Sequence, residues 1–380
     1  MVRRQLWVRG AVVGVVAALL APGGQAALEY TFVDLGTGPP GFTSASLLGG
    51  GGGQLVGAAM GPSTGGFGHA VLWPSPGSAP IDVHPTSYAG SAALAADGTQ
   101  QAGYAFSGIP PNHHFHAMVW SGAAAGAVDL HPAGFTESYA QGVSQGQQVG
   151  YASGAGTGDN PHAIVWSGSA SSFTDLHPTG YTSSNARAVY AGRQAGGVLG
   201  PQTGGASHAA LWSGRPDTFM DLNPSWLTGS GIFGMYGNQQ VGSGNLPAGD
   251  THAILWTGTA DSAIDLNPKG IFGSTAFATN GSQQVGMLQP LFGGYFHAVV
   301  WSGTAESAVD LGAFTPTVYQ WSRARAIDSH GNVFGAVSFD WGSPLHAAAW
   351  MLVPEPTTLA LVAFVGIALG TRRFGCRMRD

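Results

Sequence analysis

Cysteine is nearly absent from this sequence of 380 residues, in which the single example is Cys376 near the C-terminus. The body of the chain therefore offers no disulfide, no thiolate metal site and no cysteine nucleophile. Hydrophobic residues make up 44% of the sequence, which is enough for a packed core even though there are 62 glycines. Without disulfides, that core must hold the fold.

Charged residues are also scarce, at 8% of the sequence. Seven of the 13 basic residues lie near the two ends, so the body keeps 13 − 7 = 6, namely Arg187, Arg193, Arg215, Lys269, Arg323 and Arg325. It also holds 17 of the 19 acidic residues, which gives a net charge of 6 − 17 = −11. A surface of this sign disfavours a phosphate backbone, and we expect no nucleic-acid partner.

Motifs of the common catalytic classes are absent. The sequence shows no serine nucleophile elbow, phosphate loop or zinc motif, and the glycine run at 49–53 precedes no helical pattern. Five unrepeated acids could form a glycosidase pair across the mouth of a ring, but their spacing selects no pair: Glu137, Asp159, Asp250, Glu306 and Asp340. We therefore expect no catalytic residue, metal or cofactor, with a glycan hydrolase or lyase as the alternative.

The N-terminal segment 1–26 has the pattern of a secretory signal. Arg3, Arg4 and Arg9 form a basic region, an apolar run follows at 11–21, and a small-x-small cleavage site lies at 24–26. The pattern predicts export and processing by signal peptidase.

The C-terminal segment 354–380 places Pro354, Glu355 and Pro356 before an apolar run at 357–370, with Arg372 and Arg373 behind it. The run is shorter than the roughly 20 residues that span a bilayer, and the arginines place the body outside. This arrangement resembles the PEP-CTERM sorting signal of Gram-negative bacteria. The resemblance implies transient anchoring in the inner membrane, recognition by an exosortase and transfer to the cell surface; a simple C-terminal anchor is the alternative.

The body between these segments, 27–353, repeats one phrase. His-Ala-x-x-Trp recurs seven times, with successive histidines 44 to 49 residues apart. The histidines are His69, His116, His162, His208, His252, His297 and His346, and the tryptophans are Trp73, Trp120, Trp166, Trp212, Trp256, Trp301 and Trp350. An Asp-Leu or Asp-Val phrase recurs with them, at Asp34, Asp82, Asp129, Asp175, Asp221, Asp265 and Asp310. Each unit contains four short alternating segments separated by turn residues, which is the blade length of a β-propeller.

The two ends of the body together make one unit. The segment around Asp34 is a fourth strand with no His-Ala-x-x-Trp strand before it, and the segment that ends at Trp350 lacks an Asp-Leu strand after it. A linear stack of repeats has no reason to divide a unit, whereas a ring can pair the two parts and remove exposed edges. The sequence therefore predicts an all-β, seven-bladed propeller of four-stranded blades, closed by the N- and C-terminal strands sharing one blade.

The phrases Val-Asp-Leu, His-Ala-x-x-Trp and Gln-Val-Gly, with Ala-Ile-Asp before Gly331-Asn332, resemble the HAF family of extracellular repeats. The resemblance covers nearly the whole body. The departures are mild, with Val83 in place of leucine and a degraded Gln-Gln-Val-Gly at 193–196. Membership of this family would imply an exported protein but names no activity.

The sevenfold histidines, tryptophans and aspartates are expected to be structural, because a catalytic group is needed once per site. We expect each tryptophan to supply core burial and each histidine to bond the aspartate of its blade or backbone, since buried polar groups need partners. Ten of 13 histidines follow the repeat, including His84, His131 and His177 after the aspartate. The local cluster of His113, His114 and His116 is weak evidence for a metal.

Residues outside the repeat are the better candidates for ligand contact. Trp226, Trp321 and Trp341 lie in turn-like settings and could stack on sugars. Tyr88, Phe135 and Tyr181 share a turn position and either do the same or fill gaps between blades. The sequence predicts a monomeric, cell-surface, non-catalytic binding or matrix protein, associated with exopolysaccharide or biofilm, whose ligand is a polysaccharide or another surface protein.

Overall fold

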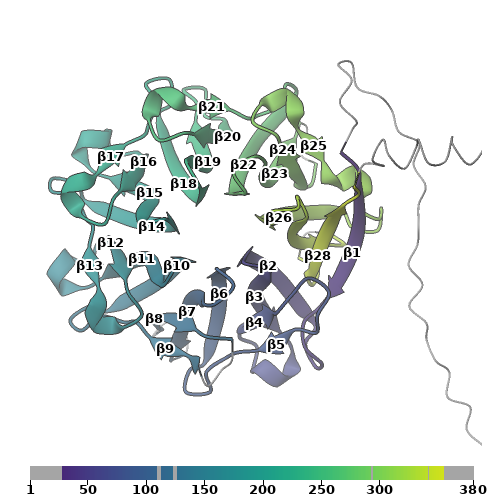
Figure 1. Cartoon of the computed structure of the whole chain (residues 1–380), viewed down its shortest axis with the longest axis horizontal. Helices are drawn as coiled ribbons and strands as arrows, with labels where there is room; N and C mark the ends of the chain where they lie inside the picture. Colours follow the sequence, from purple (N-terminus) through teal and green to yellow (C-terminus); the bar gives the residue numbers. More distant parts are fainter. Residues whose placement is uncertain (1–27, 109–112, 123–125, 292–293, 341, 355–380) are drawn as a thin grey trace, which may run out of the picture. The chain divides into compact units, whose positions relative to one another are not determined.

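The computed structural model of the chain describes residues 28–108, 113–122, 126–291, 294–340 and 342–354. The propeller comprises Tyr30–Leu352 and contains seven four-stranded antiparallel sheets around a common axis (Figure 1). The predicted all-β, seven-bladed fold is confirmed. The sorting signals predicted at 1–26 and 354–380 lie outside the described residues, except for Pro354.

Each of the first six blades contains four strands that are consecutive in sequence. Blade 1 has β2 (Ser44–Gly51), β3 (Gln54–Met60), β4 (His69–Trp73) and β5 (Ile81–Asp82), and blade 2 has β6 (Gly90–Ala96), β7 (Gln101–Ser107), β8 (His114–Trp120) and β9 (Val128–Asp129). Blade 3 has β10 (Glu137–Ser144), β11 (Gln147–Ser153), β12 (His162–Trp166) and β13 (Thr174–Asp175), and blade 4 has β14 (Ser183–Tyr190), β15 (Arg193–Leu199), β16 (Ser207–Trp212) and β17 (Met220–Asp221). Blade 5 has β18 (Gly229–Tyr236), β19 (Gln239–Asn245), β20 (Thr251–Trp256) and β21 (Ile264–Asp265), and blade 6 has β22 (Ile271–Thr279), β23 (Gln284–Pro290), β24 (His297–Trp301) and β25 (Val309–Asp310).

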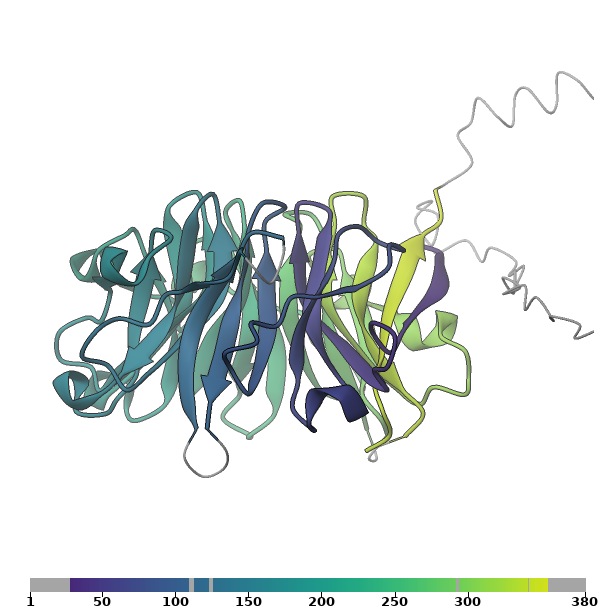
Figure 2. The same cartoon turned by 90° about the horizontal axis from the view of Figure 1, so that it is seen from below.

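Blade 7 combines β26 (Trp321–Ile327), β27 (Val333–Ser338) and β28 (His346–Leu352) with β1 (Tyr30–Gly36). Strand β1 pairs antiparallel with β28, from Tyr30 opposite Leu352 to Gly36 opposite Ala347. The fourth strand of this sheet therefore precedes blade 1 in the sequence. Figure 2 shows the blades side-on, with their strands crossing the thickness of the propeller.

Short 3-10 helices occupy several of the connections. They are η1 (Pro62–Thr64), η3 (Ala155–Thr157), η4 (Ala170–Ser172), η5 (Pro201–Thr203), η6 (Pro216–Thr218), η7 (Ala260–Ser262), η8 (Ala305–Ser307) and η9 (Leu311–Phe314). In the described part of the chain, no helix has the length and apolarity needed to cross a bilayer.

The seven repeated tryptophans are fully buried, six of them pack against residues of the preceding blade, and Trp350 donates to Thr315 in the connection from blade 6. Trp166 of blade 3, for example, belongs to a cluster with Ala117, Val119 and Leu130 from blade 2 and its connection to blade 3. Burying a side chain of this size contributes on the order of 2–3 kcal/mol. The tryptophan of each unit therefore fixes one blade against the next.

The glycine of the Gln-Val-Gly phrase is required by close backbone contact. Gly150 on β11 lies opposite Ala140 of β10, and a Cβ there would overlap the carbonyl oxygen of Tyr139. The same overlap would occur at Gly286 on β23, against the carbonyl oxygen of Thr275. Only glycine lets the first two strands of a blade approach this closely.

Candidate functional site

Every repeated histidine hydrogen bonds the repeated aspartate of its own blade, as the sequence predicts. The histidine Nδ1 atoms lie 2.7–3.0 Å from the aspartate carboxylate oxygens. In blade 7 the pair is His346 on β28 with Asp34 on β1. The pairs join the third strand of each blade to the fourth, so these groups are committed to the scaffold.

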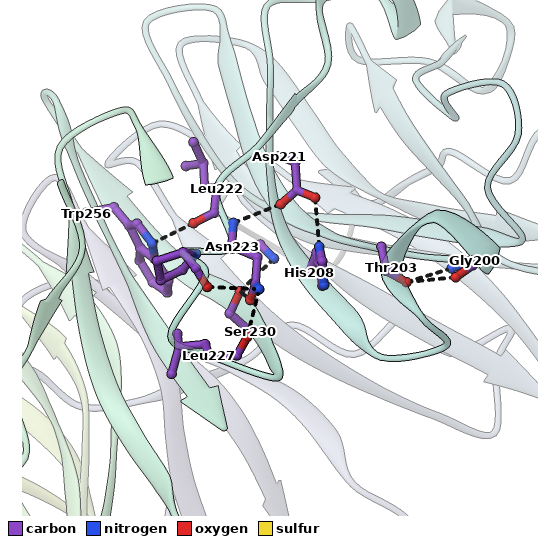
Figure 3. Close-up of polar contacts among 11 residues, drawn as sticks. Gly200, Thr203, His208, Asp221, Leu222, Asn223, Leu227, Ser230 and Trp256 are labelled. Atoms are coloured by element: carbon purple, nitrogen blue, oxygen red, sulfur yellow. Dashed lines mark hydrogen bonds and ion pairs between the residues drawn. The ribbon is translucent and has the colours of Figure 1, made fainter. Parts of the chain in front are cut away.

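In blades 1 to 5 a polar network continues from the pair into the next blade, shown for blades 4 and 5 in Figure 3. Asp221 accepts from His208 Nδ1 at 2.7 Å and from the backbone N–H of Asn223 at 2.8 Å. Asn223 accepts from the hydroxyl of Ser230 on β18 at 2.6 Å, and that Oγ accepts from the backbone N–H of Ala209 at 3.0 Å. The network therefore links adjacent blades as well as adjacent strands.

Histidine or asparagine serves at this connecting position. His84, His131 and His177 bond Ser91, Ser138 and Ser184 of the following blade at 2.8–2.9 Å, as Asn223 and Asn267 bond Ser230 and Ser274. Each histidine also stacks on the paired histidine of its blade, with ring centroids 3.8–4.1 Å apart. Burial, and next the adjacent histidine, hold the pKa of all three below its ordinary value.

Blades 6 and 7 depart from this pattern, because Gly312 and Gly36 occupy the connecting position and bring no side chain onto the paired histidine. In blade 7 the rings of Tyr319 and Phe339 contact His346 instead. The His297 side chain is 32% exposed, compared with 15–26% for the other six paired histidines. The hydrogen bond that His297 donates to Asp310 raises the pKa of His297. The connection from blade 6 to blade 7 is also longer. A backbone N–H of β24 bonds a serine hydroxyl on the inner strand of blade 7, and the two residues are 24 positions apart in the sequence. The same bond joins residues 21 positions apart in five other junctions.

A pocket of about 320 Å³ opens at this junction. Its described lining consists of Tyr295, His297, Gly312, Thr315, Thr317, Tyr319, Gln320 and Ser322. Thr317 and Gln320 are exposed and can donate or accept hydrogen bonds, while Tyr295 offers a half-buried ring. Aromatic faces combined with a few convergent polar groups are suited to a small polar ligand such as a sugar.

Tyr319 is held in the pocket wall by contacts with blade 7. Its hydroxyl donates to Asp34 at 2.8 Å, and its ring stacks on Phe339 with centroids 5.0 Å apart. Burial, and then the bond to Asp34, raise the pKa of Tyr319 above its ordinary value, so the hydroxyl stays protonated. The wall is therefore preformed.

The two described tryptophans that were predicted to contact sugar, Trp226 and Trp321, belong to different blades. Trp226 lies in the connection before β18 and is 39% exposed, as expected for a turn. The prediction of a turn is wrong for Trp321, which begins the innermost strand of blade 7 and lies beside Arg323, 5.4 Å from guanidinium carbon to ring centroid. The connection before it is three residues longer than in five other junctions, and this length obscured the strand start. Trp341 lies outside the described residues.

The aromatic residues at the shared turn position fill gaps between blades. The Phe135 ring contacts Phe173 at 5.7 Å and the Tyr181 ring contacts Phe219 at 5.1 Å. Tyr88 donates to Asp129 at 2.9 Å. These contacts support the packing interpretation of the three residues.

The acids considered for a glycosidase pair are dispersed over different elements. Glu137 begins the inner strand β10, whereas Glu306 lies in η8 between two outer strands, and Asp340 accepts from Ser343 in a loop. In the histidine cluster, His116 pairs with Asp129 while His113 contacts Phe106. Among the described residues, no three histidine, cysteine or acidic side chains are arranged to hold a metal.

Sequence reasoning missed three sets of residues. The serines that join blades, such as Ser184, and the buried glutamines, such as Gln148, recur at fixed places and could have been found by aligning the repeats. Three arginines on inner strands, Arg187, Arg323 and Arg325, form the third set. They make up half of the six basic residues of the body, which was a usable signal.

No family model and no curated protein matches this sequence. Solved structures match it in fold at low identity. The chain is similar to prolyl oligopeptidase B from Galerina marginata (12% identity, TM-score 0.54, covering 83% of this chain and 50% of that one). It is also similar to the β-propeller domain of the Trilobed protease from Pyrococcus furiosus (8%, 0.52, 81% and 94%) and to an acylaminoacyl peptidase from Pyrococcus horikoshii (8%, 0.51, 82% and 52%). The chain spans about half the length of the two peptidases, and the likeness shows the propeller scaffold alone.

Proposed function

We propose that this chain is an exported, surface-sorted binding protein that holds extracellular polysaccharide without cleaving it. Export and sorting are supported by the sequence patterns at 1–26 and 354–380 and by the likeness to HAF repeats. Binding is supported by the pocket between blades 6 and 7, which joins Tyr295 and Tyr319 to the polar groups of Thr317 and Gln320.

One observation carries the choice of binding over hydrolysis: none of the described residues lining that pocket is a carboxylic acid. A glycosidase of the usual kind needs two carboxyl groups about 5–10 Å apart across the scissile bond. The neighbouring Asp310 is occupied by His297 and by the N–H of Gly312. The pocket can therefore position a sugar but lacks the pair that would break its glycosidic bond.

Binding of the purified full-length protein to an array of bacterial and plant glycans tests this proposal. We expect neutral oligosaccharides to bind, and the variants Tyr295→Ala and Gln320→Ala to weaken the interaction about fivefold, because each removes a contact worth roughly 1 kcal/mol. Tyr236→Ala is the matched control, since Tyr236 is 46% exposed and lies on blade 5. Binding that Tyr295→Ala and Gln320→Ala leave unchanged would exclude this pocket.

A further inference from the structure

The innermost strand of every blade contains one bulged residue at the same position. These residues interrupt the pairing of the first two strands and are Leu48, Leu94, Gln141, Arg187, Phe233, Phe277 and Arg325. A bulge redirects a side chain relative to its strand, and such bulges are common beside binding sites. The innermost strands lie nearest the propeller axis (Figure 1). Two of the seven bulged residues are therefore arginines on axial strands.

Contacts between blades show that the bulged residues form a connected group. The guanidinium carbon of Arg187 lies 4.8 Å from the ring centroid of Phe233, and that of Arg325 lies 3.9 Å from Phe277. The two phenylalanine rings contact each other at 5.7 Å. A row of side chains thus runs from blade 4 to blade 7, where Arg323 adds a third guanidinium.

The three positive charges affect one another although blades 5 and 6 separate Arg187 from Arg325 in the ring. Burial, and then the charges of Arg323 and Arg187, together lower the pKa of Arg325 to about 9. Burial lowers the pKa of Arg323 to about 10, and it also lowers that of Arg187. All three remain protonated at neutral pH, so positive charge is concentrated at the axis of a body whose net charge is −11.

No carboxylate neutralises this charge among the described residues. Among the described residues, the only ion pair that involves arginine or lysine joins Arg215 to Asp217, at η6 between the two outer strands of blade 4. Glu137 is the one acid on the seven innermost strands, and it lies near Tyr139 and Tyr151. The Nε atoms of Arg323 and Arg325 are buried without a hydrogen-bond partner in the described structure. The three arginine side chains are half-buried, and positive groups partly withdrawn from water in this way favour a neighbouring anion.

A polar cleft of about 170 Å³ adjoins Arg187 between blades 4 and 5. Its lining includes Asn185, Ser207, Gly231, Ser243 and Asn245, whose side chains or backbone offer hydrogen bonds. A cavity of about 150 Å³ holds a benzene ring. The cleft therefore has room for the carboxylate-bearing part of a sugar unit beside a guanidinium that can hold the carboxylate through two parallel hydrogen bonds.

We propose that the axial side of the inner strands binds a carboxylate-bearing saccharide, such as a uronate unit of an acidic polysaccharide, through Arg187, Arg323 and Arg325. The inference rests on the proposed function, which supplies the class of ligand, a saccharide. It adds that the ligand is negatively charged and that it binds at a second site. Phe233, Phe277 and Trp321 each lie beside one of the three guanidinium groups, so aromatic surface adjoins each positive charge.

Isothermal titration calorimetry of the purified full-length protein tests this site. The probes are an oligogalacturonate and a neutral oligoglucan of equal length, at about 0.15 M salt, where charges more than about 8 Å apart are screened. We expect oligogalacturonate to bind, and Arg323→Gln, Arg325→Gln and Arg187→Gln each to weaken it at least tenfold. Arg215→Gln, which removes an exposed guanidinium, should bind like the wild type.

Two further measurements keep the test decisive. The arginine variants should unfold at the same or a higher temperature than the wild type, because each removes an unneutralised half-buried cation. Gly231→Thr places a side chain in the cleft, and threonine is chosen because Thr275 occupies the equivalent position on the next inner strand. A Cβ added at Gly231 meets no other atom within 4 Å, so the substitution should not disturb the fold. It should weaken oligogalacturonate binding in a chain that folds normally.

Unchanged oligogalacturonate affinity in the arginine variants would overturn the inference, as would equal displacement by sodium sulfate at the same concentration, which would indicate a site for any anion. Either result leaves the proposed function standing if neutral glycans still bind and Tyr295→Ala still weakens them. Absence of binding to every glycan would remove both proposals.

Discussion

Exchanging His177 for asparagine should cost almost nothing at pH 8 and should make the protein less sensitive to acid. The His177 ring makes two hydrogen bonds. Its Nδ1 bonds Ser184 Oγ at 2.9 Å, and its Nε2 donates to the Tyr181 carbonyl at 3.2 Å. In the next blade Asn223 makes the equivalent pair, to Ser230 at 2.6 Å and to the Leu227 carbonyl at 3.2 Å. His177→Asn therefore replaces two bonds with two, and we expect the free energy of unfolding to change by less than about 1 kcal/mol.

Alanine at the same position shows how much stability the two hydrogen bonds contribute. His177→Ala removes both bonds and leaves the Tyr181 carbonyl without its partner, which should cost about 2–3 kcal/mol. For a domain of this size, that loss lowers the melting temperature by roughly 4–6 °C. Asn223→His is the reverse exchange and should also be tolerated at pH 8.

The pH dependence follows from the direction of the pKa shift. Burial, then the adjacent His162, lowers the pKa of His177 below its ordinary value of 6.5. The unfolded chain therefore binds a proton more readily than the folded chain does. The neutral ring contributes stability that is present above pH 6.5 and is lost as the pH falls through the folded pKa. Asparagine does not titrate, so His177→Asn should be more stable than the wild type at pH 5.

Urea unfolding at pH 8 and pH 5, followed by tryptophan fluorescence, measures both effects on the same samples. The reasoning is refuted if His177→Asn is as destabilised as His177→Ala at pH 8. It is also refuted if the wild type and His177→Asn lose the same amount of stability between the two pH values.

Two other substitutions probe the scaffold. Trp256→Phe should cost about 1 kcal/mol more than Trp212→Phe in urea unfolding, because Trp256 Nε1 donates to the Leu222 carbonyl at 2.9 Å whereas Trp212 Nε1 has no partner among the described residues; equal losses would show that this bond contributes nothing. Gln148→Leu should cost about 1–3 kcal/mol, because the N–H of Gly168 loses its acceptor, although Leu55 fills the equivalent place in blade 1; wild-type stability would contradict this.

The fold was predictable because the repeat carries its determinants locally. His162 and Asp175 are 13 residues apart, and the strands that carry them are neighbours in one blade, so the pairing requires only a hairpin. The burial of Trp166 follows from its size and its recurrence. The prediction of seven four-stranded blades depended on nothing beyond one repeat and a count of repeats.

The candidate sites were harder to predict because they arise where the repeat is broken. The pocket between blades 6 and 7 depends on Gly312 and on a longer connection. The sequence does not show that these changes expose the His297 side chain. The proximity of Arg187 to Arg325 depends on the curvature of the whole ring. Trp321 was misplaced for the same reason, since the extra residues before it resemble a turn.

The central claim is that the chain holds glycans and leaves them intact. The most direct measurement incubates the full-length protein with the oligosaccharides that bind it, then analyses both the bound fraction and the recovered sugars by mass spectrometry. We predict bound ligand of unchanged chain length after prolonged incubation. Shortened or unsaturated products that appear with the wild type would contradict the account and establish a hydrolase or lyase.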